Sequence, residues 1–273
     1  MLNRCYDYCV KTRLLILPII IFCFSAVASA KDCGRRFRII VNNYAPLFDV
    51  NNEGHVHGLT FEFMNELSVR LGCIVSQAPM DAPRMHDDFK NWRADIVGLV
   101  IPSEKFRSSG EYVPVYSTVR KLLVNKAFYD PARSIADYIK DGRIKFGDQI
   151  GTRFFLKLAE KDLLIGAGRI VEYPSPATGY RQVVSGRVQA MFTSPAVYNY
   201  YQKVIPDFNQ NVVAVPDPEY EMQGGIYLSL RRISKSEAEQ IRKAISDMRK
   251  DGTLRRIVAK YTSAEDMVYY KDL

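Results

Sequence analysis

Arginine side chains stand just beyond three short apolar runs, where the sequence predicts that buried strands end. The arginines and the runs before them are Arg84 after residues 73–77, Arg107 after residues 96–101 and Arg153 after residues 145–150. Open α/β sheets bind ligands at the carboxyl ends of their strands, and a guanidinium can hold a carboxylate through two hydrogen bonds. The pattern therefore indicates a crevice that binds an anion. In the alternative, each arginine is a solvated surface group, and Lys105 could take the role of Arg107.

Thr152 and Arg153 add a second kind of contact to an anion. They stand between the expected strand at residues 145–150 and an expected helix at residues 154–162. The amino end of a helix presents free backbone N–H groups and the positive end of the helix dipole, which favour an anion. We therefore expect both residues to face the ligand. In the alternative, only the backbone at Thr152 binds and Arg153 points to solvent.

Two similar stretches, residues 91–107 and 185–201, would position these side chains. Each has a polar lead-in, a short apolar run and an exit through Ser and Pro, which is typical of a buried parallel strand. About 90 residues separate the two stretches, so the sequence predicts two α/β lobes that face one cleft. The further expected elements are strands at residues 36–41, 73–77, 111–124, 169–173, 211–215 and 226–230, helices at 60–71, 130–141, 178–185 and 196–204, and a linker at 216–225. Ser236 and Glu239 have the spacing of a capping box for a long helix that would break at residues 251–252.

The composition limits the class of protein. The chain has 273 residues, of which 47% are hydrophobic and 25% charged, and this suits one or two domains with a full core. Residues 1–30 have a basic start, an apolar run at 14–27 and a final Ala-Ser-Ala, which together indicate a cleavable secretory signal peptide. An uncleaved anchor is the alternative. Without its three basic residues and one acidic residue, the net charge falls from +8 to +6. This balance favours anionic ligands, and the absence of a Lys/Arg stripe excludes nucleic acid as an expected partner.

Cys33 and Cys73 are the two cysteines that lie outside residues 1–30. An even number of cysteines in an oxidising compartment points to one disulfide. The two residues belong to one βαβ unit, whose strands are commonly neighbours, so we expect them to be joined. They lack a second ligand pair at the spacing of a metal site, and His55 and His57 lack a third ligand nearby. No metal or cofactor is therefore expected.

Seven motifs, in a fixed order along the chain, carry a resemblance to a known family. They are the Tyr-x-Pro loop at residues 43–46, a Gly-aromatic helix at 58–71, a strand-to-Arg segment at 94–107, a Pro-Tyr hinge at 114–117, a Gly-Thr helix start at 151–152, a Gly-Arg strand at 186–190 and a tail with Asp-Gly-Thr at 225–260. Over nearly all of residues 31–273 the chain resembles the extracellular solute-binding proteins, family 3, of bacterial ABC importers. The resemblance implies a periplasmic monomer that binds a small molecule, docks on a membrane permease and is not an enzyme.

The resemblance also implies an architecture. It is the α/β, two-lobed, type II periplasmic binding protein fold, in which each lobe has a mainly parallel sheet flanked by helices. Lobe 1 would comprise residues 31–118 and 224–273, and lobe 2 residues 119–223. Hinge crossings at residues 116–119 and 218–225 would let the lobes close on the solute.

The ligand site departs from the pattern of the family. In the family, an arginine after the third strand clamps a ligand carboxylate. An alignment without gaps from Asp95 places Arg107 at that position, whereas an alignment of the proline-glutamate pattern places Lys105 there. The family's carboxylate, which receives a ligand ammonium group, aligns with Ser194. We therefore expect a small polar or anionic solute, with Tyr44 covering its apolar part and Ser194 offering a neutral hydrogen bond. The alternatives are an exported dehydratase-like enzyme on the same scaffold and a soluble ligand-sensing partner of a receptor.

Overall fold

The computed structural model describes residues 33–150 and 155–273. The expected signal peptide, Thr152 and Arg153 lie outside the described residues. The eight strands of the main sheet follow the order β4-β1-β5-β10-β6-β9-β7-β8. They are β1 (Arg36–Asn42), β4 (Ile74–Met80), β5 (Ile96–Val100), β6 (Gly110–Asn125), β7 (Phe146–Gln149), β8 (Ile170–Tyr173), β9 (Ala190–Thr193) and β10 (Val212–Ser229), and a small hairpin adds β2 (Asp49–Val50) and β3 (Val56–His57).

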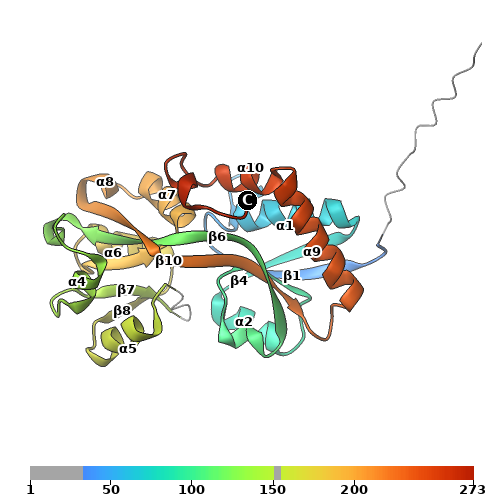
Figure 1. Ribbon diagram of the computed structural model, residues 1–273, viewed down its shortest axis with the longest axis horizontal. Coiled ribbons are helices and arrows are strands. Elements are labelled where there is room, and N and C mark those ends of the chain that lie inside the picture. The colour runs from blue at the N-terminus through green and yellow to red at the C-terminus, as the bar shows by residue number, and fades with distance from the viewer. Residues whose placement is uncertain (1–32, 151–154) are drawn as a thin grey trace, which may run out of the picture. The chain divides into compact units, whose positions relative to one another are not determined.

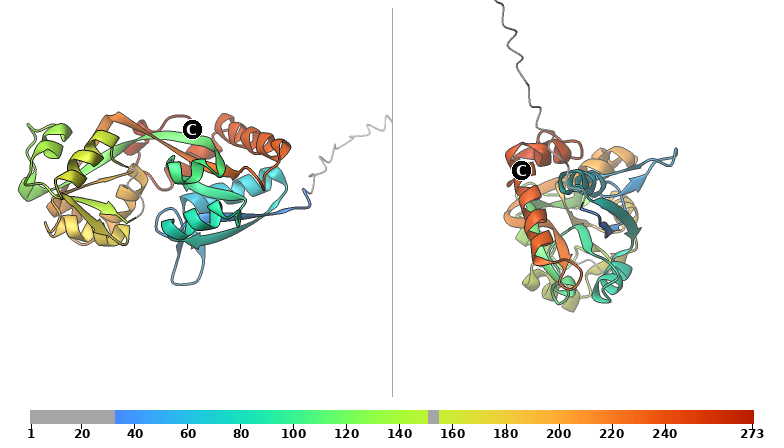
Figure 2. Two further views of the ribbon diagram at one scale, coloured as in Figure 1. Left: turned by 90° about the horizontal axis from the view of Figure 1, so that it is seen from below. Right: turned by 90° about the vertical axis from the view of Figure 1, so that its right-hand side faces the viewer.

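The strands form two parallel groups that two long strands connect. β4, β1 and β5 run parallel at one end of the sheet, and β9, β7 and β8 run parallel at the other end. β6 and β10 pair antiparallel with each other and pass between the groups (Figures 1 and 2). We call the first group with its helices lobe 1 and the second group with its helices lobe 2. The expected fold class is confirmed, whereas the proposed boundaries at residues 118/119 and 223/224 remain a prediction.

Helices cover both faces of each parallel group. Lobe 1 carries α1 (Leu59–Leu71), α9 (Lys235–Lys250) and α10 (Thr253–Ala259) on one face, and α2 (Ala82–Lys90) and α3 (Glu104–Arg107) on the other. Lobe 2 carries α6 (Pro176–Val184), α7 (Pro195–Val204) and α8 (Phe208–Asn211) on one face, and α4 (Ile135–Lys140) and α5 (Leu158–Gly166) on the other. The shorter 3₁₀ segments are η1 (Lys126–Phe128) and η2 (Asp266–Tyr269).

The alternation of side chains along the strands builds the two cores of each lobe. In β6, Leu123 packs into the core beneath α6 and α7, whereas its neighbours Leu122 and Val124 pack into the core beneath α4 and α5. In β1, Ile39 and Ile40 divide between the two cores of lobe 1 in the same way. Successive side chains of a strand point to opposite faces, so continuous apolar runs fill both sides of a sheet.

The expected linker at residues 216–225 is instead the middle of β10. This strand has 18 residues and pairs with β6 from Val212 to Ser229. Pro218, Gly224 and Gly225 lie where the register shifts, between Asp217 and Glu221 and between Gly224 and Gly225, whereas Pro216 pairs in register with Lys121. Proline is tolerated at a bulge because no ladder hydrogen bond is needed there. The two expected strands at 211–215 and 226–230 are therefore the ends of one strand.

Two helix starts also differ from the sequence-based expectation. The capping box of α9 is formed by Ser234 and Glu237, two residues before the expected pair of Ser236 and Glu239. The helix expected to begin at residue 154 begins at Leu158. A second Ser-x-x-Glu spacing lies two residues away in the first case, so the spacing alone could not select the cap. In contrast, α1 ends as expected at Gly72, whose φ of 64° is the left-handed conformation that glycine adopts easily.

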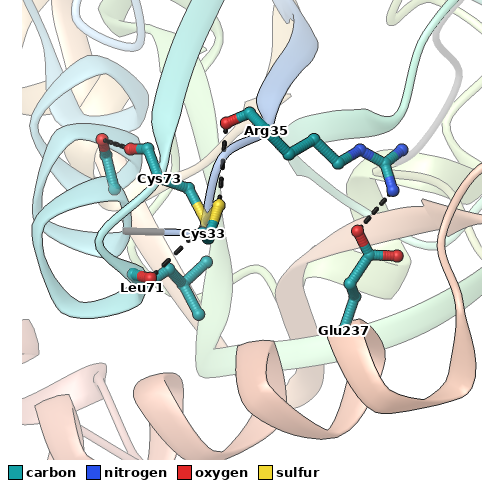
Figure 3. The surroundings of a disulfide bond; sticks show 6 residues. Cys33, Arg35, Leu71, Cys73 and Glu237 are labelled. Atoms are coloured by element: carbon teal, nitrogen blue, oxygen red, sulfur yellow. Dashed lines mark hydrogen bonds and ion pairs between the residues drawn. A yellow bond between two sulfur atoms is a disulfide. The ribbon is translucent and has the colours of Figure 1, made fainter. Parts of the chain in front are cut away.

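The expected disulfide joins Cys33 and Cys73, whose Cα atoms are 5.1 Å apart. It ties the chain before β1 to the start of β4 (Figure 3), and the Cys33 N–H donates a hydrogen bond to the Gly72 carbonyl at 3.2 Å. Beside it, Arg35 pairs with Glu237 on α9. No helix within residues 33–150 and 155–273 combines the length and the apolar character that crossing a membrane requires.

Candidate functional site

A pocket lies where the two lobes meet the connecting strands, with a cavity volume of about 70 Å³. Lobe 1, lobe 2 and the strands β6 and β10 all contribute to its lining. The lining residues are Asn42, Tyr44, Leu47, Leu99, Val100 and Ile101 from lobe 1, Gln149, Phe155, Ser194 and Val197 from lobe 2, and Tyr116, Thr118, Met222 and Gly224 from the connecting strands. Because both lobes and both crossings line one cavity, a change in the angle between the lobes would reshape it.

The ends of parallel strands bring these residues together. Asn42 ends β1, Val100 ends β5 and Gln149 ends β7. Ser194 follows β9 and is the N-cap residue of α7. Carboxyl ends of strands are the edge at which open α/β sheets bind ligands. The pocket therefore lies at the edge to which the sequence assigned the crevice.

Two half-buried tyrosines, Tyr44 and Tyr116, form part of the aromatic wall. Burial raises the pKa of Tyr44 to about 12 and raises the pKa of Tyr116 well above its ordinary value, so both hydroxyls stay protonated and can donate hydrogen bonds at neutral pH. The absence of a side chain at Gly224 leaves room for the Tyr116 ring, because a Cβ on this glycine would lie 2.4 Å from Cζ of the ring. A side chain at position 224 would thus displace the tyrosine from the pocket.

The lining is neutral within the described residues. Its polar side chains are Asn42, Tyr44, Tyr116, Thr118, Gln149 and Ser194, and the other side chains are apolar. The two buried cations on β6 already have partners: Arg120 pairs with Glu160 and Asp217, and Lys121 pairs with Asp266. The described part of the pocket therefore offers hydrogen bonds and apolar surface. In the same residues, no group of three His, Cys, Asp or Glu side chains could hold a metal ion.

Arg120 holds Phe155, the pocket residue that precedes α5 in lobe 2. Its guanidinium is fully buried and donates to the Phe155 carbonyl at 2.5 Å and to both carboxylate oxygens of Glu160 at 2.6 Å. Burial tends to raise the pKa of Glu160, but the hydrogen bonds from Arg120 and from the Lys157 N–H outweigh burial, and the pKa is lowered. These bonds tie Phe155 and the first turn of α5 to β6.

The structure brings together only some of the residues that the sequence predicted for the site. Tyr44 and Ser194 both line the pocket. Arg84 lies on α2 and lines a neighbouring cavity that shares Asn42, Tyr44 and Gln149 with the first. Arg84 therefore lies at the border of the pocket, in a cavity that Ser175 at the start of α6 also lines.

Arg107 and Lys105 lie away from the pocket. The side chain of Arg107 is 68% exposed and pairs with Glu104 at 3.2 Å, and Lys105 lines a hollow beside His86 on α2. The reason is the packing of α3, whose Phe106 ring lies 4.5 Å from His86 and 5.6 Å from Phe89 between ring centroids. Burial of Phe106 turns the charged residues on either side of it outward.

Several lining residues had no signal in the sequence analysis as ligand contacts. Tyr116 falls in an expected hinge crossing, Met222 in the expected linker, and Phe155 and Val197 in expected helices. The Pro-Tyr hinge motif could have identified Tyr116, because a residue at a crossing between lobes necessarily borders the cleft. Nothing in the local pattern distinguishes Met222 from a core residue.

Comparisons with known proteins agree with this geometry. Residues 37–264 match the family of bacterial extracellular solute-binding proteins, family 3. The ABC transporter arginine-binding protein 1 of Escherichia coli (strain K12) is 22% identical over 248 residues, which cover 90% of this chain and 97% of that protein. The histidine-binding periplasmic protein of Salmonella typhimurium is 25% identical over 274 residues, which cover 92% of this chain and 96% of that protein.

Solved structures show the same fold. An ancestral arginine-binding protein bound to arginine superposes with a TM-score of 0.67 at 23% identity, covering 83% of this chain and 97% of its own. A putative binding component of an ABC transporter from Wolinella succinogenes, complexed with lysine, superposes with a TM-score of 0.72 at 14% identity. The superposition covers 84% of this chain and 96% of that chain. With the family match spanning both lobes, this chain belongs to the bacterial extracellular solute-binding proteins of family 3.

Proposed function

We propose that this protein captures a small solute in the pocket between its lobes and delivers it, as a periplasmic monomer, to the permease of an ABC importer. Its membership of the solute-binding family supports this role, as do relatives that are named as binding proteins of ABC transporters. The observation that carries the proposal is the pocket itself, because its lining comes from both lobes and from both connecting strands. Closure of the lobes would bury a solute there.

The lack of a carboxylate among the described lining residues argues against a basic amino acid as the solute. A buried ammonium or guanidinium group needs a carboxylate partner, and none of the described lining residues supplies one. Ser194 stands where the resemblance places the family's carboxylate. An apolar body of the solute would lie against Leu99, Val197 and Met222, and its polar groups would bond to the neutral donors of the wall.

An acidic group on the solute would face the border of the pocket. Arg84 lies there, and the expected contacts from Thr152 and Arg153 remain predictions outside the described residues. A clamp by Arg107 also remains a prediction, and it would require the side chain to leave Glu104. We therefore assign the anion preferentially to the Arg84 side of the pocket.

Binding is favoured over catalysis. Acid or base catalysis in the pocket would need a titratable side chain within hydrogen-bond reach of the substrate. Among the described lining residues the tyrosines are the titratable groups, and burial raises the pKa values of both, which removes them further from neutral pH. This supports a solute-binding protein and argues against a dehydratase-like enzyme.

A thermal-shift screen of residues 31–273 tests the proposal. The panel should contain carboxylates, phosphate esters, neutral sugars, neutral amino acids, and arginine and lysine. A ligand at about a hundred times its dissociation constant should add roughly 2.7 kcal/mol to the free energy of unfolding. We expect a shift with a polar or anionic compound and none with arginine or lysine. Shifts with the basic amino acids alone would contradict the assignment of the solute.

The Ser194→Asp variant sharpens this test. It places a carboxylate in the neutral pocket, so it should weaken binding of an anionic solute and create a partner for an ammonium group. The matched control is Ser185→Asp, since Ser185 lies at the end of α6 and outside the lining. If Ser194→Asp leaves the affinity of the solute unchanged in titration calorimetry, the solute does not bind beside α7.

A further inference from the structure

Residues 263–273 form a segment, here called the strap, that follows α10 of lobe 1 and reaches lobe 2. Figure 1 shows it running from α10 past the long strands toward α7. It contains η2, whose Asp266 is only 2% exposed. The strap therefore adds a contact between the lobes beside the two connecting strands.

Backbone and side-chain bonds hold the strap on the connecting strands. Ser117 of β6 and Lys271 exchange two backbone hydrogen bonds, of 3.1 and 2.9 Å, and Lys271 pairs with Glu221 of β10 at 2.7 Å. The ring of Tyr270 packs on the ring of Tyr116 with centroids 5.5 Å apart. Since Tyr116 lines the pocket, the strap supports part of the pocket wall directly.

Asp266 carries the contact with lobe 2. One carboxylate oxygen pairs with Lys121 Nζ at 2.5 Å, and the other accepts a hydrogen bond from Asn199 Nδ2 at 2.6 Å. Lys121 Nζ also lies 4.3 Å from the ring centroid of Tyr198. Lys121 and Asn199 are 7% and 2% exposed, so water cannot easily replace either contact.

Asn199 links this cluster to the pocket through α7. Its Nδ2 atom also donates to the carbonyl of Pro195 at 2.8 Å, and Pro195 follows the pocket residue Ser194 directly. Val197, in the same turn of α7, lines the pocket as well. Asn199 thus joins the amino end of α7 to Asp266 of the strap.

We propose that Asp266 is a positioning residue for solute binding. This proposal rests on the proposed function of the pocket. Through Lys121 and Asn199 it fixes the amino end of α7, and so sets Ser194 and Val197 in the pocket wall. Its carboxylate is suited to the task because it holds a buried cation and a buried amide at once. Separation of such a buried ion pair leaves unpaired charges in a site poor in water.

Hydrogen exchange measured by mass spectrometry on the free protein tests this role. The Asp266→Asn variant keeps the shape of the side chain but leaves Lys121 without its counter-charge. We expect exchange in peptides that cover residues 194–201 and 116–119 to accelerate by roughly tenfold or more, because these amides would open locally. Exchange in β7 and β8 should stay unchanged.

Two further variants separate positioning from general destabilisation. Asp247→Asn removes the exposed pair with Lys243 on α9, in which Lys243 is 76% exposed, and should leave exchange at α7 unchanged. Asp266→Asn combined with Lys121→Met removes the unpaired charge while an amide oxygen can still accept from Asn199, so exchange at α7 should return toward that of the natural protein. The double variant tests the role of the ion pair even if Asp266→Asn alone folds poorly.

The outcomes separate this proposal from the solute proposal, because no solute is added. Unchanged exchange at residues 194–201 in Asp266→Asn would overturn the positioning role. An equal acceleration throughout residues 33–150 and 155–273 would overturn it too, because it would show a general structural role only. If the thermal-shift screen finds no polar or anionic solute, the hydrogen-exchange results on the free protein still stand.

Discussion

Replacement of Arg120 by methionine should strongly destabilise lobe 2. Methionine keeps an unbranched apolar stem but removes the guanidinium, which is fully buried. The carboxylates of Glu160 and Asp217, with side chains 12% and 9% exposed, would then lose their counter-charge. The Phe155 carbonyl would lose its donor as well.

The size of the effect follows from the number of contacts. The guanidinium makes four hydrogen bonds, one from Nε to Asp217 at 2.8 Å and three from its Nη atoms to Glu160 and Phe155. It also lies between two rings, 3.9 Å from the Phe192 centroid and 4.1 Å from that of Tyr220. Removal of one partner from a buried ion pair typically costs about 3–5 kcal/mol.

Thermal and urea unfolding of the two proteins measure this cost. A loss of about 3–5 kcal/mol corresponds to a decrease in Tm of about 6–20 °C for a protein of this size class. The control is Arg143→Met, because Arg143 is 84% exposed, and exposed ion pairs contribute only about 0–1 kcal/mol. Adding Glu160→Gln and Asp217→Asn to Arg120→Met should recover part of the loss. If Arg120→Met costs no more than the control, the argument from buried charge is wrong.

Three further predictions concern the disulfide, acid and the hinge. Replacing Cys33 and Cys73 together by serine should cost roughly 3–4 kcal/mol, because the bridge closes a loop of 40 residues; urea unfolding that matches the natural protein would contradict this. Burial and the charge of Lys105 lower the pKa of His86 to about 4, so only the unfolded chain takes up a proton below about pH 6.5. The free energy of unfolding should therefore fall as the pH decreases from 6.5 to 4, and a His86→Phe variant that falls equally would refute the cause. Small-angle scattering should show compaction when a solute saturates the protein, and an unchanged profile would count against hinge closure.

The sequence was informative where one physical rule decided the outcome. A short apolar run that a proline closes, such as residues 96–101, favours a strand that is buried on both faces, and β5 has this environment. Gly72 ends α1 because few other residues tolerate its positive φ. The disulfide followed from a count of cysteines together with the neighbouring strands of a βαβ unit.

The sequence was less informative where tertiary packing outweighs the local preference of a segment. The prolines of residues 216–218 predict a loop by themselves, but pairing with β6 outweighs that local preference. Whether Arg107 reaches the cleft depends on the direction in which Phe106 is buried, and the spacing of charges after β5 does not contain that information. Met222 and Val197 look like core residues because the pocket wall and the core are made from the same apolar side chains.

The crystal structure of residues 31–273 with the solute identified by the screen tests the central claim most directly. Our account predicts electron density for the solute between Tyr44, Tyr116 and Ser194, with its apolar part against Val197. An acidic group of the solute should point toward Arg84. A solute bound against α3 beside Arg107, outside the pocket, would contradict the account.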